Sequence, residues 1–176
     1  TARAVRWTAF VPLPEALLTG CASVYHSIRC ALALADYIGD SQPEWEVALG
    51  RLGHAIAEHL IRHVAHLVAI AARTGQTLSL ALEPEPYCYL ETIEETVGFF
   101  KERLFGRAGV ARLAALSGLS APQAEAAMRK HIGVCYDVCH AAVEFEDPAQ
   151  SIAQLRANGI LVGKLQLSSA LKVAAP

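Results

Sequence analysis

The sequence predicts an α/β fold with a parallel sheet, and three observations support this prediction. Apolar, strand-like segments alternate along the chain with helical segments. The connections between these strands are long enough for parallel crossovers. The hydrophobic fraction is 53%, which is typical of strands that are buried on both faces. Because 176 residues are enough for one domain with a real core, we expect a single domain over residues 1–176.

The strands are predicted from alternating side chains. In a strand, successive residues point to opposite faces of the sheet. The last three predicted strands each place a polar, ligand-type residue near the C-terminal end, namely Glu83, Asp137 and Gln166. A further strand is predicted from a β-branched and aromatic segment that ends at two prolines. The predicted strands cover residues 5–11, 77–83, 132–137 and 161–168.

The helices are predicted from apolar periodicity and from capping residues. Residues 44–73 form the strongest pattern, with apolar residues at three- and four-residue steps and Gly75 placed to end the helix. Thr92 and Glu95 have the spacing of a capping box. Asp147 followed by Pro148 is typical of a helix start. The other expected helices cover part of 15–38, two short segments within 107–131, and 147–158.

The helix expected at 44–73 also carries a group of histidines. These are His54, His59, His63 and His66. Their spacing on one helix face would suit a metal site. The alternative is a solvent-facing polar surface opposite the apolar stripe. We favour that alternative, because the glutamate of an HExxH motif is missing.

Composition excludes several classes of protein. The net charge of −2 argues against a protein that binds nucleic-acid backbones. Residues 115–130 resemble a helix-turn-helix reader only faintly, so we expect a helical connection between strands there. The 5 cysteines are odd in number and scattered, which does not indicate a disulfide framework. We find no secretion signal and no long uncharged apolar run, so we predict a cytoplasmic protein without a membrane span.

Four polar residues are candidates for a metal site. In a closed parallel barrel the C-terminal strand ends meet at one mouth, where Glu83, Asp137, His140 and Gln166 would converge. Two carboxylates, an imidazole and an amide oxygen suit Mn²⁺, Mg²⁺, Co²⁺ or Zn²⁺. The alternatives are that Glu83 and Asp137 only cap the helices that follow, or that Glu85 replaces Glu83 as a ligand.

Lys164 lies one pleat deeper than Gln166 on the same strand face. It would pair with a carboxylate, orient a substrate oxygen, or extend its ammonium group to solvent. We therefore assign candidate catalytic roles to Glu83, His140 and Lys164.

Three motifs support a resemblance to a known family. They are Leu82–Pro86, Gly133–Glu146 and Gly163–Leu171. Together they resemble the xylose-isomerase-like TIM-barrel superfamily, and within it the bacterial metabolite traffic proteins of the EboE type. Members carry a strand-end Glu, an Asp-x-x-His, a His or Gln on the next strand, and a closing Glu. The closing Glu has no counterpart here.

This resemblance implies a fold and a function. A complete TIM barrel needs about 250 residues, so we expect an incomplete barrel, or a fragment with its middle strands. The resemblance implies a divalent-metal sugar isomerase or epimerase involved in handling or transport of a secondary-metabolite precursor. It also admits a non-catalytic metabolite-binding protein or an endonuclease-IV-like phosphodiesterase. Open edges at the outer strands predict self-association.

Overall fold

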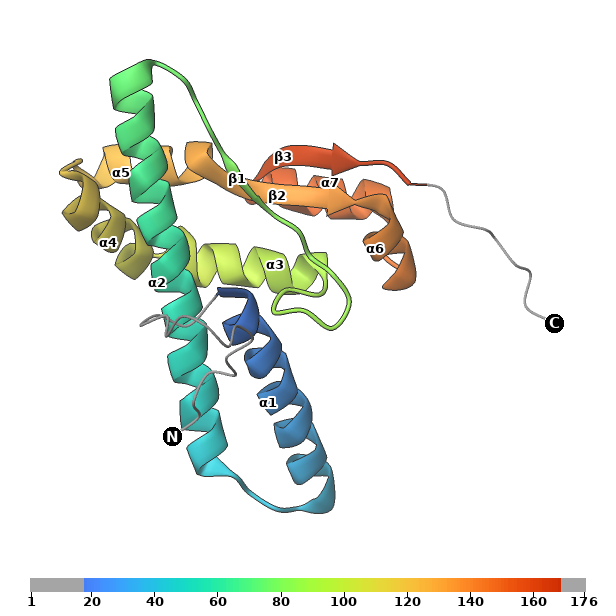
Figure 1. Cartoon of the computed structure of the whole chain (residues 1–176). Coiled ribbons are helices and arrows are strands. Elements are labelled where there is room, and N and C mark those ends of the chain that lie inside the picture. The colour runs from blue at the N-terminus through green and yellow to red at the C-terminus, as the bar shows by residue number, and fades with distance from the viewer. Residues whose placement is uncertain (1–17, 169–176) are drawn as a thin grey trace, which may run out of the picture.

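The computed structural model describes residues 18–168, and Figure 1 shows their arrangement. The strand expected at 5–11 lies outside the described residues. The described elements are α1 (Leu18–Ile38), α2 (Pro43–Thr74), β1 (Leu80–Leu82), α3 (Ile93–Phe99), the π-helix η1 (Phe100–Leu104), α4 (Arg107–Ser117), α5 (Ala121–His131), β2 (Ile132–Asp137), α6 (Val138–Val143), α7 (Pro148–Ala157) and β3 (Leu161–Gln166).

The described part of the chain contains one parallel sheet and no barrel. The strand order is β1-β2-β3, with Leu80 opposite Ile132 and Asp137 opposite Gln166. The α/β class and the parallel strands are confirmed. The predicted TIM barrel, complete or partial, is wrong, because three strands with two free edges cannot close on themselves as eight strands do. The placement in the xylose-isomerase-like superfamily and its EboE branch, which implied that barrel, is wrong as well.

Helices make up most of the structure. Long helices α1 and α2 form an antiparallel hairpin on one side of the molecule, and the sheet lies on the other side with α6 and α7 (Figure 1). Between β1 and β2 the chain forms α3, η1, α4 and α5, which confirms the expected helical connection. Helices α4 and α5 pack against α2. They are therefore part of the packed core, and this placement argues against a free DNA-reading unit.

The helix ends follow the predicted capping signals. Gly75 ends α2 in the left-handed conformation at φ 72°, which glycine adopts without a steric penalty. The Thr92 hydroxyl accepts a hydrogen bond from the Glu95 N–H at 3.2 Å. The Asp147 carboxylate accepts one from the Gln150 N–H at 2.9 Å. These contacts satisfy backbone groups that the first helical turn leaves unpaired.

Helix α2 supplies the centre of the core. Its side chains Ile56, Leu60 and Val64 are almost fully buried against the neighbouring helices and β2. The side chains of His54, His63 and His66 are exposed, and His59 is half-buried. Among the described residues, the α2 histidines contribute to no group of potential metal ligands. The exposure of three of these histidines agrees with the predicted polar surface, and the absence of a metal site on α2 stays a prediction.

Helix α2 is also long and apolar enough, by length and composition alone, to cross a membrane. Its most apolar window has a mean hydropathy of 1.3, and 28% of that window is buried. Core helices of globular proteins often meet the same criteria, and α2 packs against α1, α4 and α5. The length and hydropathy of α2 are therefore only weak evidence for a membrane span. The expected absence of a span stays a prediction.

Strand β1 is shorter than predicted, and its end defines one side of the site. It covers Leu80–Leu82 rather than 77–83. Pro84 and Pro86 follow, and proline has no N–H for a sheet hydrogen bond. Within the described residues β1 and β3 each pair only with β2. Self-association through these edges stays a prediction.

Candidate functional site

The C-terminal edge of the sheet brings together three residues from different segments of the chain. Glu83 comes directly after β1, Asp137 is the last residue of β2, and His140 lies in α6. Because the strands are parallel, their carboxyl ends meet at the same edge, although the β2–β3 register shifts between Val134 and Cys135. One potential ligand atom from each residue lies within 4.8 Å of the other two.

Asp137 is the buried member of this group, with a relative exposure of 5%. One carboxylate oxygen accepts a hydrogen bond from the Cys139 N–H at 2.7 Å and one from the Ser168 hydroxyl at 3.5 Å. The other oxygen accepts one from the Gln166 amide. Burial raises the pKa of Asp137, but the N–H of Cys139, the imidazole of His140 and the Gln166 amide together hold it below its ordinary value. Asp137 is therefore a carboxylate at neutral pH.

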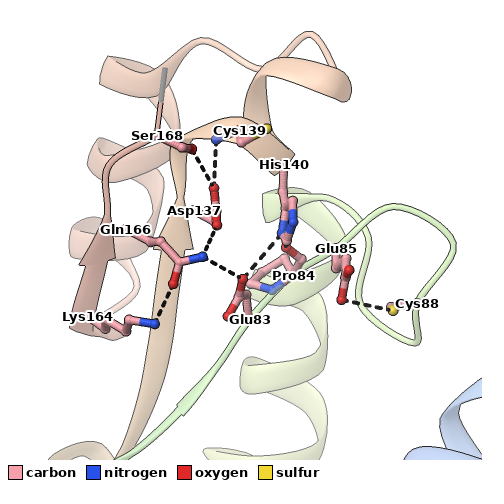
Figure 2. Close-up of polar contacts among 10 residues, drawn as sticks. All are labelled: Glu83, Pro84, Glu85, Cys88, Asp137, Cys139, His140, Lys164, Gln166 and Ser168. Carbon is pink, nitrogen blue, oxygen red and sulfur yellow. Dashed lines mark hydrogen bonds and ion pairs between the residues drawn. The ribbon is translucent and has the colours of Figure 1, made fainter. Parts of the chain in front are cut away.

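Gln166 lies between the two carboxylates (Figure 2). Its amide nitrogen donates to Asp137 and approaches the Glu83 carboxylate at 3.5 Å. Its amide oxygen accepts a hydrogen bond from the Lys164 ammonium group. A neutral N–H₂ group thus occupies the position between two negative charges that a cation would favour. To act as a ligand, Gln166 would need to turn its amide so that the oxygen faces the carboxylates.

His140 completes the group from α6. Its Nδ1 lies 3.5 Å from a Glu83 carboxylate oxygen and 3.3 Å from the Pro84 carbonyl oxygen. A ring nitrogen that faces two acceptors favours the tautomer with hydrogen on Nδ1. In that tautomer Nε2 keeps its lone pair for a ligand.

The structure decides between the alternatives for the two glutamates. Glu85 turns away from the group, and its carboxylate accepts a hydrogen bond from the Cys88 thiol at 3.6 Å (Figure 2). Glu83 caps no helix, since Thr92 is the N-cap of α3. Asp137 does cap α6 through Cys139. Asp137 therefore caps a helix and also accepts hydrogen bonds from Gln166 and Ser168, whereas Glu83 does not cap α3.

Two contacts were not predicted as parts of the site. Ser168 reaches the Asp137 carboxylate, and Pro84 offers its carbonyl oxygen to His140. Ser168 shares the alternating strand face of Lys164 and Gln166, so this signal was present in the sequence. The Pro84 contact depends on the loop conformation, which no local pattern specifies. Lys164 also differs from one expectation, because it is exposed and its ammonium group contacts Gln166 rather than a carboxylate.

The floor of the site is tightly filled. Cys135 is 2% exposed, and burial, followed by the negative charge of Glu83, raises the pKa of its thiol. The thiol therefore stays protonated at neutral pH, and the available ligands are oxygen and nitrogen atoms. A cavity beside Asp137 has a volume of only about 10 Å³. A substrate would have to lie on the open side, where Glu83 and Lys164 are exposed.

Comparison with known proteins gives one short match. No protein-family model and no solved structure matches the chain. A 45-residue segment is 89% identical to part of the MMP endo-(1,4)-3-O-methyl-alpha-D-mannosidase of Mycolicibacterium hassiacum. The match covers 26% of this chain and 12% of that relative. The chain is therefore similar to this mannosidase over one segment, and the match is too short to define its family.

Proposed function

We propose that the sheet edge binds a divalent cation through Glu83, Asp137 and His140 and acts on a small sugar-like substrate as an isomerase or epimerase. The observation that carries this proposal is the convergence of two carboxylates and an imidazole within 4.8 Å. Like charges this close repel each other, and a cation removes that cost. The Gln166 amide hydrogens that point at both carboxylates support a cation at this position.

The donor set suits Mn²⁺, Mg²⁺, Co²⁺ or Zn²⁺. Carboxylate oxygens and an imidazole nitrogen are ligands that these ions accept. When bound, such an ion would polarise a carbonyl or hydroxyl oxygen of the substrate. Gln166 would serve as a further ligand once its amide has turned over. That rotation would remove the acceptor of Lys164 and leave its ammonium group for a substrate oxygen.

The side chains supply the groups that an isomerisation needs. Glu83 is exposed on the open side, where its carboxylate would take a proton from a hydroxyl-bearing carbon and return it to the adjacent carbon. The Lys164 ammonium group would stabilise the negative charge that develops on the substrate oxygen. His140 would hold a hydroxyl group or serve as a ligand. The proton of the neighbouring hydroxyl group would move to the carbonyl oxygen in the same isomerisation, so no further reactant is required.

Metal binding is tested first, by elemental analysis and titration calorimetry on the full chain. We expect near-stoichiometric metal in the wild-type protein and an affinity at least about tenfold lower in Asp137→Asn and Glu83→Gln. Glu85→Gln is the matched control, because it removes a carboxylate from the same loop outside the group. Metal that is absent from the wild type, or unchanged in both site variants, would refute the site.

Turnover is tested next, with aldoses and ketoses followed by NMR. We expect isomerisation, and we expect EDTA to abolish it. The Lys164→Met substitution should also abolish isomerisation while the metal stays bound. Metal binding without turnover on this panel would instead support a non-catalytic protein that binds a metabolite.

The mannosidase match favours a second candidate, glycoside hydrolysis by Glu83 and Asp137. Their closest oxygens lie within 4.8 Å, nearer to the separation of about 5–5.5 Å in retaining glycosidases than to the about 6.5–9.5 Å in inverting ones. Such hydrolysis needs no metal. Cleavage of an α-mannoside that continues in EDTA and is lost in Asp137→Asn would favour this candidate over the isomerase.

A further inference from the structure

A second candidate site lies away from the sheet edge, between α1 and the segment that runs from Tyr89 to η1. Its volume is about 310 Å³, which is at the lower end for small-molecule sites. Tyr25 and Arg29 line it from α1, and Tyr89, Glu95 and Arg103 line it from the other side. It shares none of these residues with the metal-binding group.

Two tyrosines form the aromatic part of this pocket. The rings of Tyr25 and Tyr89 are 4.5 Å apart and nearly perpendicular, at 72°. Tyr89 also packs edge to face on Phe99, at 5.3 Å between ring centroids. Burial raises the pKa of Tyr89 to about 12, so its phenol keeps its proton. Among the described residues no hydrogen bond engages that hydroxyl group, which lies beside Gly53 of α2.

The charged side chains of the pocket are balanced in number. Arg29 and Glu95 form an ion pair at 2.9 Å. Glu102 and Arg103 also line the pocket, and within residues 18–168 neither side chain makes an ion pair or a hydrogen bond. The pocket therefore offers both donors and acceptors with no excess of either charge. This balance disfavours a strongly charged ligand and suits a ligand with many hydroxyl groups.

An unusual backbone feature forms one wall. Residues Phe100–Leu104 adopt a π-helix, closed by a hydrogen bond from the Phe105 N–H to the Phe100 carbonyl at 2.7 Å. Such turns are rare and occur frequently at functional sites. Because the turn is wider, the side chains within it point in other directions than they would on an α-helix. Here it carries Glu102 and Arg103, the two charged residues of the pocket without a partner.

We propose that this pocket binds the ring of a neutral sugar. A pyranose ring would place its C–H face on an aromatic ring of the Tyr25–Tyr89 pair, since such rings offer a large apolar surface with a polar end. Its hydroxyl groups would accept from Arg103 and donate to Glu102, as a polar ligand must replace its bonds to water. The proposal does not depend on metal binding at the sheet edge.

The test is an NMR titration of the full chain with methyl α-D-mannopyranoside. We expect shifts of the Tyr89, Gly98 and Arg103 amide signals, with a dissociation constant in the millimolar range that is typical of small contacts. Tyr25→Leu and Arg103→Met should each weaken binding about tenfold. Arg107→Met is the matched control, because this exposed arginine of α4 lies outside the pocket, and it should leave the affinity unchanged.

Two outcomes would overturn this proposal. One is no shift at these amides with the mannoside. The other is a shift that is lost in Asp137→Asn but kept in Tyr25→Leu, which would place sugar binding at the sheet edge and leave only the first proposal standing. A titration with phosphate serves as a comparison. If phosphate shifts these amide signals and the mannoside does not, the pocket is an anion site instead. Amide spectra of both variants confirm that they fold.

Discussion

The carboxylate of Glu58 and the pair Glu83–Asp137 show two ways in which this protein holds negative charge. Glu58 lies on α2 and receives Arg112 at 2.6 Å and Arg62 at 2.8 Å. Arg112 also donates through Nε to both carboxylate oxygens, at 3.0 Å each. Planar two-point contacts of this kind are the strongest that a guanidinium group makes with a carboxylate. Glu58 is thus fully satisfied within the fold.

The sheet edge holds its charges differently. Glu83 and Asp137 share one neutral amide nitrogen from Gln166, and Lys164 contacts the amide oxygen rather than either carboxylate. The His140 ring lies 3.5 Å from Glu83. A fold that needed these charges only for stability would have paired them as it pairs Glu58. Incompletely paired charges at one place are typical of a ligand site. The helical region therefore supplies stability, and the sheet edge is the place where we propose that a cation binds.

The largest effect on the free energy of unfolding should come from Leu113→Ala in the helical core. Leu113 in α4 has 0% exposure, so its truncation leaves a cavity that costs about 2–5 kcal/mol in the free energy of unfolding. Urea denaturation measures this loss. Metal affinity of the folded variant should stay at the wild-type value. An affinity that falls as far as in Asp137→Asn would show that the two regions are coupled.

Glu58→Gln should lower the free energy of unfolding by a smaller amount, and this loss should depend on pH. The Arg112 hydrogen bond, partly offset by burial and supported by Arg62, lowers the pKa of Glu58 below its ordinary 4.5. A lowered pKa in the folded state adds stability above about pH 4.5, and this stability is lost as the pH falls further.

The stability difference between wild type and Glu58→Gln should therefore be constant near neutral pH and shrink in acid. Urea denaturation from neutral to acidic pH measures it. The double variant with Arg112→Met tests the pair, because removing both partners should cost less than the sum of the single changes. Strict additivity would contradict a direct interaction.

The smallest effect on the free energy of unfolding should come from Glu83→Gln in EDTA, and it should be a gain rather than a loss. Without a cation, removal of this charge relieves its repulsion with Asp137. We expect a gain on the order of 0.5 kcal/mol, the scale of exposed charge interactions. Thermal and urea unfolding measure it, with Glu85→Gln as the neutral comparison. A clear loss of stability would show that Glu83 is held for structure, as Glu58 is.

Local signals in the sequence predicted much of the site. Alternation along two strands predicted that Asp137 and Gln166 lie together at the end of the sheet, since the strand period is a local property. The parallel direction of the strands also agrees with the structure. The orientation of the Gln166 amide and the contact of Pro84 with His140 were not predictable, because both depend on atoms that approach from distant segments.

The sequence by itself determined where several helices begin or end. Gly75, Thr92 and Asp147 mark helix ends because their backbone or side chain satisfies groups within a few residues. The tertiary structure alone decided whether the sheet closes. Three strands remain open in the described chain, and closure depends on pairing between distant strands, which short motifs do not encode. The pocket beside α1 likewise depends on contacts between remote segments, Tyr25 with Tyr89 and Arg29 with Glu95.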